Sequence, residues 1–358
     1  MTTFGVYVHV PFCAHRCDYC AFATYDDRDY LRDDYVDAVL REIAWEVEAG
    51  MLPATSVFFG GGTPSRLTPV QLVRILEAIP RTRDAEVTVE CNPEDASLDR
   101  LLTYKSGGVT RMSYGVQSTQ PAGLADLGRR HGTMAHEEVS RVTHDAGFST
   151  WNMDLIVGSR AESLDDVRAT LKDLLDLDFP PPHISCYALT PEPGTPLGQD
   201  PARHPDEDDT ADAYDLVGET LEANGYEWEE ISNWARPGHE CRHNHVYWDH
   251  DDYVGFGSAA HSHRHGRRYW NVRTPERYIA MVRRGERPLG GEEVLDEATQ
   301  AFERDSLALR TRRGVPVEAF ESLEEIKHLV HVEENQVTLT PKARLVANQV
   351  IIRLKSSP

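Results

Sequence analysis

Six short apolar segments that alternate with helical patterns constrain the fold of this chain more than any other feature. The apolar segments span residues 5–10, 56–59, 86–90, 111–116, 151–157 and 184–189. Amphipathic stretches lie between them, at residues 29–49, 69–79, 98–105, 134–146 and 163–176. Strands that alternate with helices in this way form a parallel sheet, because each helix carries the chain back to the start of the next strand. We expect an α/β fold, built as a partial (β/α)6 barrel or as an open sheet.

The chain is predicted to have three parts. Residues 1–200 would form the α/β domain, and a stretch rich in Pro, Gly and Asp follows at its end. Residues 201–274 would hold a linker helix at about 206–224 and a block rich in aromatic residues and histidine. Residues 275–358 are expected to form a smaller, mostly helical domain that ends in a short strand pair and a helix.

Charge and hydropathy exclude several classes of partner. A formal net charge of −22 disfavours non-specific binding of nucleic acids or anionic membranes, which needs a basic surface. The sequence has no apolar run of about 18 residues, and MTTFGVYVHV lacks the features of a signal peptide. We therefore expect a cytoplasmic protein, in which clustered thiols are more often metal ligands than disulfides.

Motifs with polar or glycine-rich sequence follow five consecutive predicted strands. In chain order they are a cysteine loop, GGGTP, ECNPE, GVQS and NMDLIVG. Ligands of α/β proteins bind at the carboxyl ends of parallel strands. The sequence therefore predicts a ligand site at that end of the sheet.

The cysteine loop supplies three thiols with the spacing C-x3-C-x2-C, from Cys13, Cys17 and Cys20. A closed zinc site has four ligands, so His9 or His15 would have to complete it. An iron–sulfur cube held by three cysteines instead leaves one iron open to an external ligand. Spacing alone leaves both sites open.

The C-x3-C-x-aromatic-C pattern resembles the radical S-adenosylmethionine (SAM) superfamily. The resemblance implies a [4Fe–4S] cluster whose open iron binds SAM, with Tyr19 packed near the adenine. In that family an electron from the cluster cleaves SAM to a 5′-deoxyadenosyl radical. The segment GGGTP resembles the glycine-rich segment that receives the SAM amino group in that family, and its exposed backbone N–H groups would suit a carboxylate or amine partner. Residues that match SAM-contacting positions are Tyr7, Tyr19, Gly61, Gly62, Thr63, Glu90, Gln117, Arg129 and Asp154.

Each of these polar residues has a chemical role and a plainer alternative. Arg129 would pair with a carboxylate, and Glu90 or Asp154 would accept from ribose hydroxyls or the ammonium group. Each of them would otherwise form a strand-end ion pair. One departure is the sequence Gly158-Ser159-Arg160, where relatives have Gly-Leu-Pro, and we expect it to reshape the loop beside Asp154.

Within the superfamily the chain resembles the coproporphyrinogen dehydrogenase family, closest to the HemW-type haem chaperones. Phe22 stands where the dehydrogenases have a further cysteine, and no long extension precedes Cys13. The segment HNHVYW matches the H-N-x-x-Y-W motif of the chaperone branch. The members of this motif are His243, Asn244, Tyr247 and Trp248.

Haem iron accepts an axial imidazole, with Cys or Tyr as alternatives, and the macrocycle favours aromatic neighbours. We predict His243 as the ligand, with His245 and Cys241 as competitors. The alternative is that His243 is a structural histidine in an aromatic core patch. His261 also matches a family position, and propionates would favour a nearby arginine.

The resemblance implies a haem chaperone that binds a [4Fe–4S] cluster, SAM and haem and delivers haem to apoproteins. An oxygen-independent coproporphyrinogen III dehydrogenase of porphyrin biosynthesis, or a related radical SAM enzyme, is the alternative. A zinc-bound structural protein is a third hypothesis. No catalytic residue is assigned, and a homodimer would agree with the resemblance.

Overall fold

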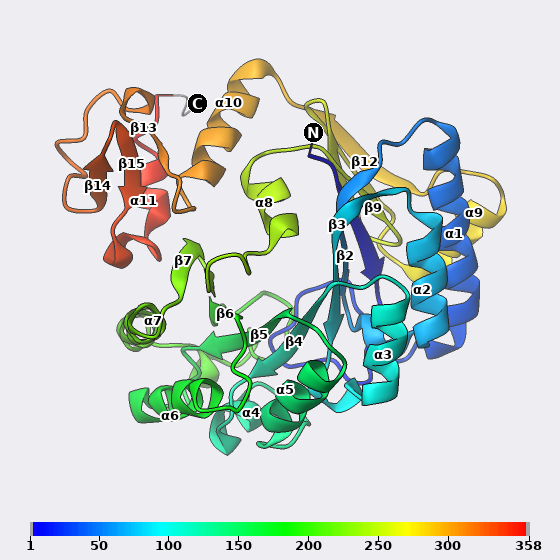
Figure 1. Ribbon diagram of the computed structural model, residues 1–358. Helices are drawn as coiled ribbons and strands as arrows, with labels where there is room; N and C mark the ends of the chain where they lie inside the picture. Colours follow the sequence, from blue (N-terminus) through cyan, green and yellow to red (C-terminus); the bar gives the residue numbers. More distant parts are fainter. Residues whose placement is uncertain (1–2, 356–358) are drawn as a thin grey trace.

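One twelve-stranded sheet organises most of the molecule (Figure 1). The computed structural model describes residues 3–355. The strand order is β12-β11-β10-β9-β1-β2-β3-β4-β5-β6-β8-β7, and β1 to β6 are parallel to one another. These six strands are β1 (Gly5–Val10), β2 (Ala54–Gly61), β3 (Arg81–Cys91), β4 (Arg111–Gln117), β5 (Thr150–Val157) and β6 (His183–Ala188). The parallel α/β prediction is confirmed, and the sheet curves as an open barrel with β12 and β7 at its edges.

Helices cover the outer face of the curved sheet (Figure 1). They are α1 (Arg32–Glu48), α2 (Pro69–Ala78), α3 (Leu98–Ser106), α4 (Pro121–Asp126), α5 (Ala135–Asp145), α6 (Leu164–Leu175) and α7 (Glu207–Ala223). Side chains fix several of their starts: Thr68 and Ser163 form capping boxes, and Asp206 accepts from two backbone N–H groups of α7. Within residues 3–355, no helix is both long and apolar enough to cross a membrane.

Short strands extend the sheet on both sides of β1–β6. They are β7 (Glu227–Glu230), β8 (Asn233–Ala235), β9 (Tyr253–Phe256), β10 (His261–Arg264), β11 (Arg267–Asn271) and β12 (Leu289–Val294). β9 runs parallel to β1, whereas β8 and β10 join their neighbours antiparallel. The histidine-rich block of the sequence is thus part of the sheet and its connections.

Helix α8 (Arg242–Trp248) carries the HNHVYW segment to the amino ends of β1–β3. The Glu86 carboxylate accepts from the backbone N–H groups of Arg242 and His243, at 3.2 and 3.0 Å. Glu86 lies level with Ser56 in β2, which in turn lies level with Gly5 at the start of β1. The segment therefore lies at the end of the strands opposite to the five motifs.

A small three-stranded sheet forms the C-terminal part. It consists of β13 (Val315–Pro316), β14 (Val330–Glu333) and β15 (Gln336–Leu339), between α10 (Glu297–Ala308) and α11 (Ala347–Ile351). It has a hydrophobic core of its own, which includes Leu309, Val337 and Val350. Helix α9 (Pro275–Arg283) packs on α1, and β12 pairs with β11, so residues 275–294 contact the main sheet. The division of the chain at residue 275 stays a prediction about folding units.

Candidate functional site

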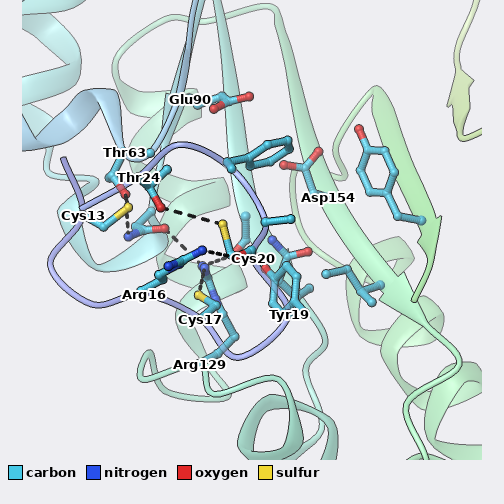
Figure 2. A pocket seen from close by; sticks show the side chains of 18 of the residues that line it. Cys13, Arg16, Cys17, Tyr19, Cys20, Thr24, Thr63, Glu90, Arg129 and Asp154 are labelled. Carbon is cyan, nitrogen blue, oxygen red and sulfur yellow. Dashed lines mark hydrogen bonds between the residues drawn. The ribbon is translucent and has the colours of Figure 1, made fainter. Parts of the chain in front are cut away.

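The carboxyl ends of β1 to β6 surround a cavity of about 410 Å³. Figure 2 shows the cysteine loop at one side of this cavity and Glu90 and Asp154 at the other. Every residue predicted for the cluster or for SAM, apart from Tyr7, lines it. We call it the strand-end pocket.

Three thiols enter the strand-end pocket from the loop after β1, and none of them forms a disulfide. Each sulfur has a polar neighbour: the Thr63 hydroxyl lies 3.7 Å from Cys13, the Thr24 hydroxyl 3.9 Å from Cys20 and Arg129 Nη1 3.4 Å from Cys17 (Figure 2). Donors of this kind stabilise thiolates, the form that binds metal. Burial raises the pKa of the Cys13 thiol to about 11, so this thiol needs a cation to ionise at neutral pH.

The three thiols of the pocket suit an iron–sulfur cluster. A cubic cluster places each thiolate on a different iron, so its ligands need not converge on one point. Within residues 3–355, no group of three His, Cys, Asp or Glu side chains is placed to hold a single metal ion. His9, which was considered for zinc, has Nδ1 at 3.1 Å from the Tyr7 hydroxyl and Nε2 at 3.1 Å from the Ala23 carbonyl.

The glycine-rich segment after β2 brings backbone against the cysteine loop. A Cβ on Gly62 would lie 2.7 Å from the Phe12 carbonyl oxygen and 3.1 Å from Cys13 Sγ. Gly61 has φ +110°, and a Cβ there would lie 2.4 Å from the His9 ring. Neither position accepts a side chain without a shift, as expected where backbone lines a cofactor site.

The N–H groups of this segment differ from our expectation. Those of Gly61, Gly62 and Thr63 donate to the Glu90 carboxylate at 3.2 Å, the Val10 carbonyl at 2.8 Å and the Phe12 carbonyl at 2.8 Å. They are therefore not exposed toward a ligand. With its donors engaged, the segment suits a cationic group such as an ammonium better than an anion.

Two carboxyl groups, of Glu90 and Asp154, face the strand-end pocket. Burial, and then the charge of Asp154, raise the pKa of Glu90 to about 8. Burial also raises the pKa of Asp154, although its Oδ1 accepts a hydrogen bond of 2.7 Å from Asn152. Because burial disfavours the charged form of both groups, a positively charged ligand would stabilise their ionised forms.

Two polar side chains of the pocket keep unpaired buried atoms. Gln117 is a non-glycine residue with φ +67°, at a register shift in β4, and its Oε1 has no hydrogen-bond partner among the described residues. Arg129 donates to Asn92 Oδ1 at 3.2 Å and to the Gly115 carbonyl, yet its Nε has no partner within residues 3–355. Strained backbone and unpaired polar atoms are costly in a folded chain unless a ligand uses them. The residues present therefore fit a cluster together with a polar ligand such as SAM.

The remaining predicted residues lie near this pocket or outside it. Tyr19 lines it, half-buried, whereas Tyr7 lies beside it in two neighbouring cavities that also contact Glu90. Residues 158–160 line a separate cavity between α6 and α7, so the departure from Gly-Leu-Pro falls outside the pocket. Asn92, which lies in the quoted ECNPE motif, was not singled out, although it joins Arg129 to the Thr63 hydroxyl.

The candidate haem ligands all have protein partners. His243 is 1% exposed, with Nδ1 at 2.9 Å from the Ser56 hydroxyl and Nε2 at 2.9 Å from the Tyr247 hydroxyl. Burial lowers its pKa to about 3. Cys241 is buried 3.7 Å from the Glu86 carboxylate, and His245 lies 2.8 Å from Glu229. Haem ligation by His243 stays a prediction, which would require the bond to Tyr247 to open.

Comparison with known proteins agrees with the site. Residues 7–174 match the family model described as the radical SAM superfamily. Proteins named heme chaperone HemW are 35% identical in Mycobacterium tuberculosis, covering 97% of this chain and 94% of theirs, and 32% identical in Bacillus subtilis, covering 97% of both. The Escherichia coli HemW is 36% identical over 72% of this chain and 69% of its own.

Among solved structures, the coproporphyrinogen III oxidase HemN of Escherichia coli superposes with a TM-score of 0.85, covering 98% of this chain and 89% of its own. At 21% identity this likeness shows the fold, which is that of a radical SAM enzyme. Family membership implies a [4Fe–4S] cluster and SAM, and the strand-end pocket holds residues suited to both. On the full-length similarity, this chain belongs to the HemW family of the radical SAM superfamily.

Proposed function

We propose that this protein is a haem chaperone, which binds a [4Fe–4S] cluster, SAM and haem and delivers haem to apoproteins. One observation carries the proposal: a chain with a complete strand-end pocket matches proteins named heme chaperone HemW over nearly its whole length. We further propose that it works in the cytoplasm and forms a homodimer.

Within this proposal, Cys13, Cys17 and Cys20 hold the cluster, and Thr63, Thr24 and Arg129 stabilise the thiolates. When bound, the cluster and SAM supply one-electron chemistry and a carbon radical. Glu90 and Asp154 would bind cationic and hydroxyl groups of SAM.

For the other SAM groups we propose two further contacts. Gln117 Oε1 would accept a hydrogen bond, and Arg129 Nε would donate one, since each is buried without a partner. Tyr19 would pack against the adenine. Tyr7, which lies beside the pocket, would orient Glu90 and His9, because it hydrogen-bonds His9 and faces the same cavities as Glu90.

The dehydrogenase remains the second candidate because the chain shares the HemN fold over nearly its whole length. Phe22, the residue in place of the further cysteine, is 68% exposed at the pocket. The test is anaerobic incubation of the reconstituted protein with coproporphyrinogen III, SAM and a strong reductant. We expect no protoporphyrinogen from a sample with an intact cluster; formation at catalytic rates would favour the dehydrogenase.

The chaperone proposal is tested by transfer. The reconstituted protein is loaded with hemin, freed of excess and mixed with apomyoglobin, while absorbance reports haem arrival. We expect haem binding with defined stoichiometry and faster delivery than from a hemin–albumin control. Failure to bind haem at micromolar concentration would overturn the proposal.

A further inference from the structure

A second cavity, of about 460 Å³, lies next to the strand-end pocket. Phe22, Gly61 and Glu90 line both. Its other walls come from β1, from α8, from the β9–β10 region and from the segment after β11, and they include Tyr7, Tyr247, Tyr253, His261 and Arg273. Its volume lies within the range of about 300–1,000 Å³ that is usual for small-molecule sites. We call it the aromatic cavity.

The aromatic residues of this cavity form a pre-arranged apolar wall. The rings of Tyr247 and Tyr253 pack edge to face, with centroids 4.7 Å apart. Phe22, which is 68% exposed, adds a further apolar ring to the lining of this cavity. A flat apolar ligand would bury these surfaces.

Four histidines line the aromatic cavity or the neighbouring cavity that contains His243, and His261 differs from the other three. His9 and His243 each have both ring nitrogens hydrogen-bonded, and His183 is bonded to Arg111 and Asn233. His261 is exposed, and within residues 3–355 neither of its nitrogens has a hydrogen-bond partner. Its ring stacks on Trp270, at 5.6 Å between centroids, which fixes its orientation without using a nitrogen.

The protonation state of His261 also suits a metal ligand. Partial burial and the charge of Arg268 lower its pKa, so the imidazole is neutral at neutral pH. A neutral imidazole with a free nitrogen is the form that binds iron.

A cation without a protein partner lies in the same cavity. Arg273 is exposed and, within the described chain, forms no hydrogen bond or ion pair. Most arginines of the small strands do have acidic partners, as Arg264, Arg267 and Arg268 do. An unpaired guanidinium at the mouth of an apolar cavity is suited to a carboxylate of a bound ligand.

We propose that the aromatic cavity is the haem site, that His261 is the axial ligand and that Arg273 binds a propionate. This inference rests on the proposed haem-binding function. His243 is then a positioning residue, which holds the Tyr247 hydroxyl and thereby the cavity wall. Since Phe22, Gly61 and Glu90 also line the strand-end pocket, haem would lie beside the SAM site.

Hemin titration of the full-length protein tests the ligand. We expect His261→Ala to lose the histidine-ligated Soret and visible bands and to bind hemin roughly tenfold or more weakly, as for an interface anchor. Added imidazole should restore the bands in this variant. His265→Ala is the matched control, because His265 is exposed on the same hairpin but lies outside the cavity. His243→Gln, chosen over alanine to retain a hydrogen-bonding group, should keep the wild-type bands.

The outcomes distinguish failure of the proposed haem site from failure of the proposed haem-binding function. Wild-type protein that binds no hemin would overturn the proposed function and the site together. Normal hemin binding with unchanged bands in His261→Ala would overturn the inference alone. Loss of the bands in His243→Gln, with His261→Ala unchanged, would assign the ligand to His243.

The propionate contact has its own test. Arg273→Ala should weaken hemin binding about two- to fivefold, the usual size of a partly exposed ion pair, and should leave binding of hemin dimethyl ester unchanged. Arg277→Ala, an exposed arginine outside the cavity, is the control. Equal effects of Arg273→Ala on hemin and on its dimethyl ester would contradict a propionate contact.

Discussion

Sequence motifs identified both the strand-end pocket and the α8 segment. The two regions differ in whether their buried polar atoms have hydrogen-bond partners within the protein. In the pocket, Gln117 and Arg129 each have a buried atom without a partner in the part of the chain that the structure describes, and the thiols form no disulfide. In α8, His243 has both nitrogens bonded, and Glu86 accepts from the start of the helix. One region holds polar atoms ready for a ligand, whereas the other has paired them within the protein.

This difference distinguishes side chains that can bind a ligand from side chains that stabilise the fold. A buried polar atom without a protein partner destabilises the fold unless water or a ligand pairs with it, so such an atom in the wall of a cavity is available to bind a ligand. A buried polar group with all partners stabilises its surroundings and shows no need for a ligand. Variants of the pocket should therefore lose ligands, and variants of α8 should lose stability.

The largest effect is expected at the thiols. Cys13→Ala, Cys17→Ala and Cys20→Ala should each lose nearly all iron and sulfide after anaerobic reconstitution, because the loop supplies no other thiol. Iron and sulfide assays, with the charge-transfer absorbance of the cluster, check this. Cys186→Ala, which removes a buried core thiol, is the control and should keep its cluster. A Cys13→Ala protein with full iron would refute the cluster assignment.

A second pair of variants compares the two regions directly. His243→Ala should lower the free energy of unfolding by about 2–4 kcal/mol, since it opens a cavity and leaves the Ser56 and Tyr247 hydroxyls unpaired. Gln117→Ala should change it by less than about 1 kcal/mol, because its Oε1 has no partner to lose, but should weaken SAM binding. Denaturation followed by circular dichroism, with SAM titration, measures both. A larger loss of stability in Gln117→Ala than in His243→Ala would contradict this difference between the two regions.

An intermediate loss of stability is expected at Gly62, where the backbone comes close to the cysteine loop. Gly62→Ala places a methyl group 2.7 Å from the Phe12 carbonyl oxygen and should cost about 1–3 kcal/mol, with weaker SAM binding. Gly132→Ala is matched to it, since a Cβ there meets no atom within 4 Å. Equal SAM affinities of the two variants, measured by calorimetry, would show that the Gly62 backbone is not near the ligand.

The last effect concerns pH. Burial and Asp154 raise the pKa of Glu90 to about 8, so the protein without ligand binds a proton there that the unfolded chain has released. Its stability should therefore fall as pH rises from about 4.5 to 8, the range between the unfolded and folded pKa values. A cationic ligand favours the ionised form, so SAM should bind more tightly as pH rises through this range.

Calorimetry in buffers of different ionisation enthalpy measures the proton released when SAM binds. Glu90→Gln should release less and flatten the pH dependence of SAM affinity. An unchanged pH profile in Glu90→Gln would assign the titration to another group, and Asp154, whose charge acts on Glu90, is the first candidate.

The part of the fold and site that could be predicted is the part with local signals. The strand at Gly5–Val10 matches its predicted bounds, and the helix predicted at about 206–224 is α7, with Asp206 as its cap. The pocket residues follow consecutive strands, so a parallel sheet brings them to one edge whatever the details of packing.

The part that could not be predicted depends on distant partners. The place of α8 is set by Glu86, which lies 157 residues before His243, and no local pattern shows that pairing. Strands such as β10, with sequence HSHR, are too short and too polar to give an alternating pattern. Arg273 carries no sequence signal, because its lack of a partner within the described part of the chain depends on how the chain folds.

The most direct test of the account is electron paramagnetic resonance of the reduced, reconstituted protein with and without SAM. If three cysteines hold a cluster with one open iron in the strand-end pocket, SAM should shift the g values of the cluster signal. Gln117→Ala should need more SAM to produce the same shift. A cluster signal that does not change at saturating SAM would contradict the assignment of the pocket.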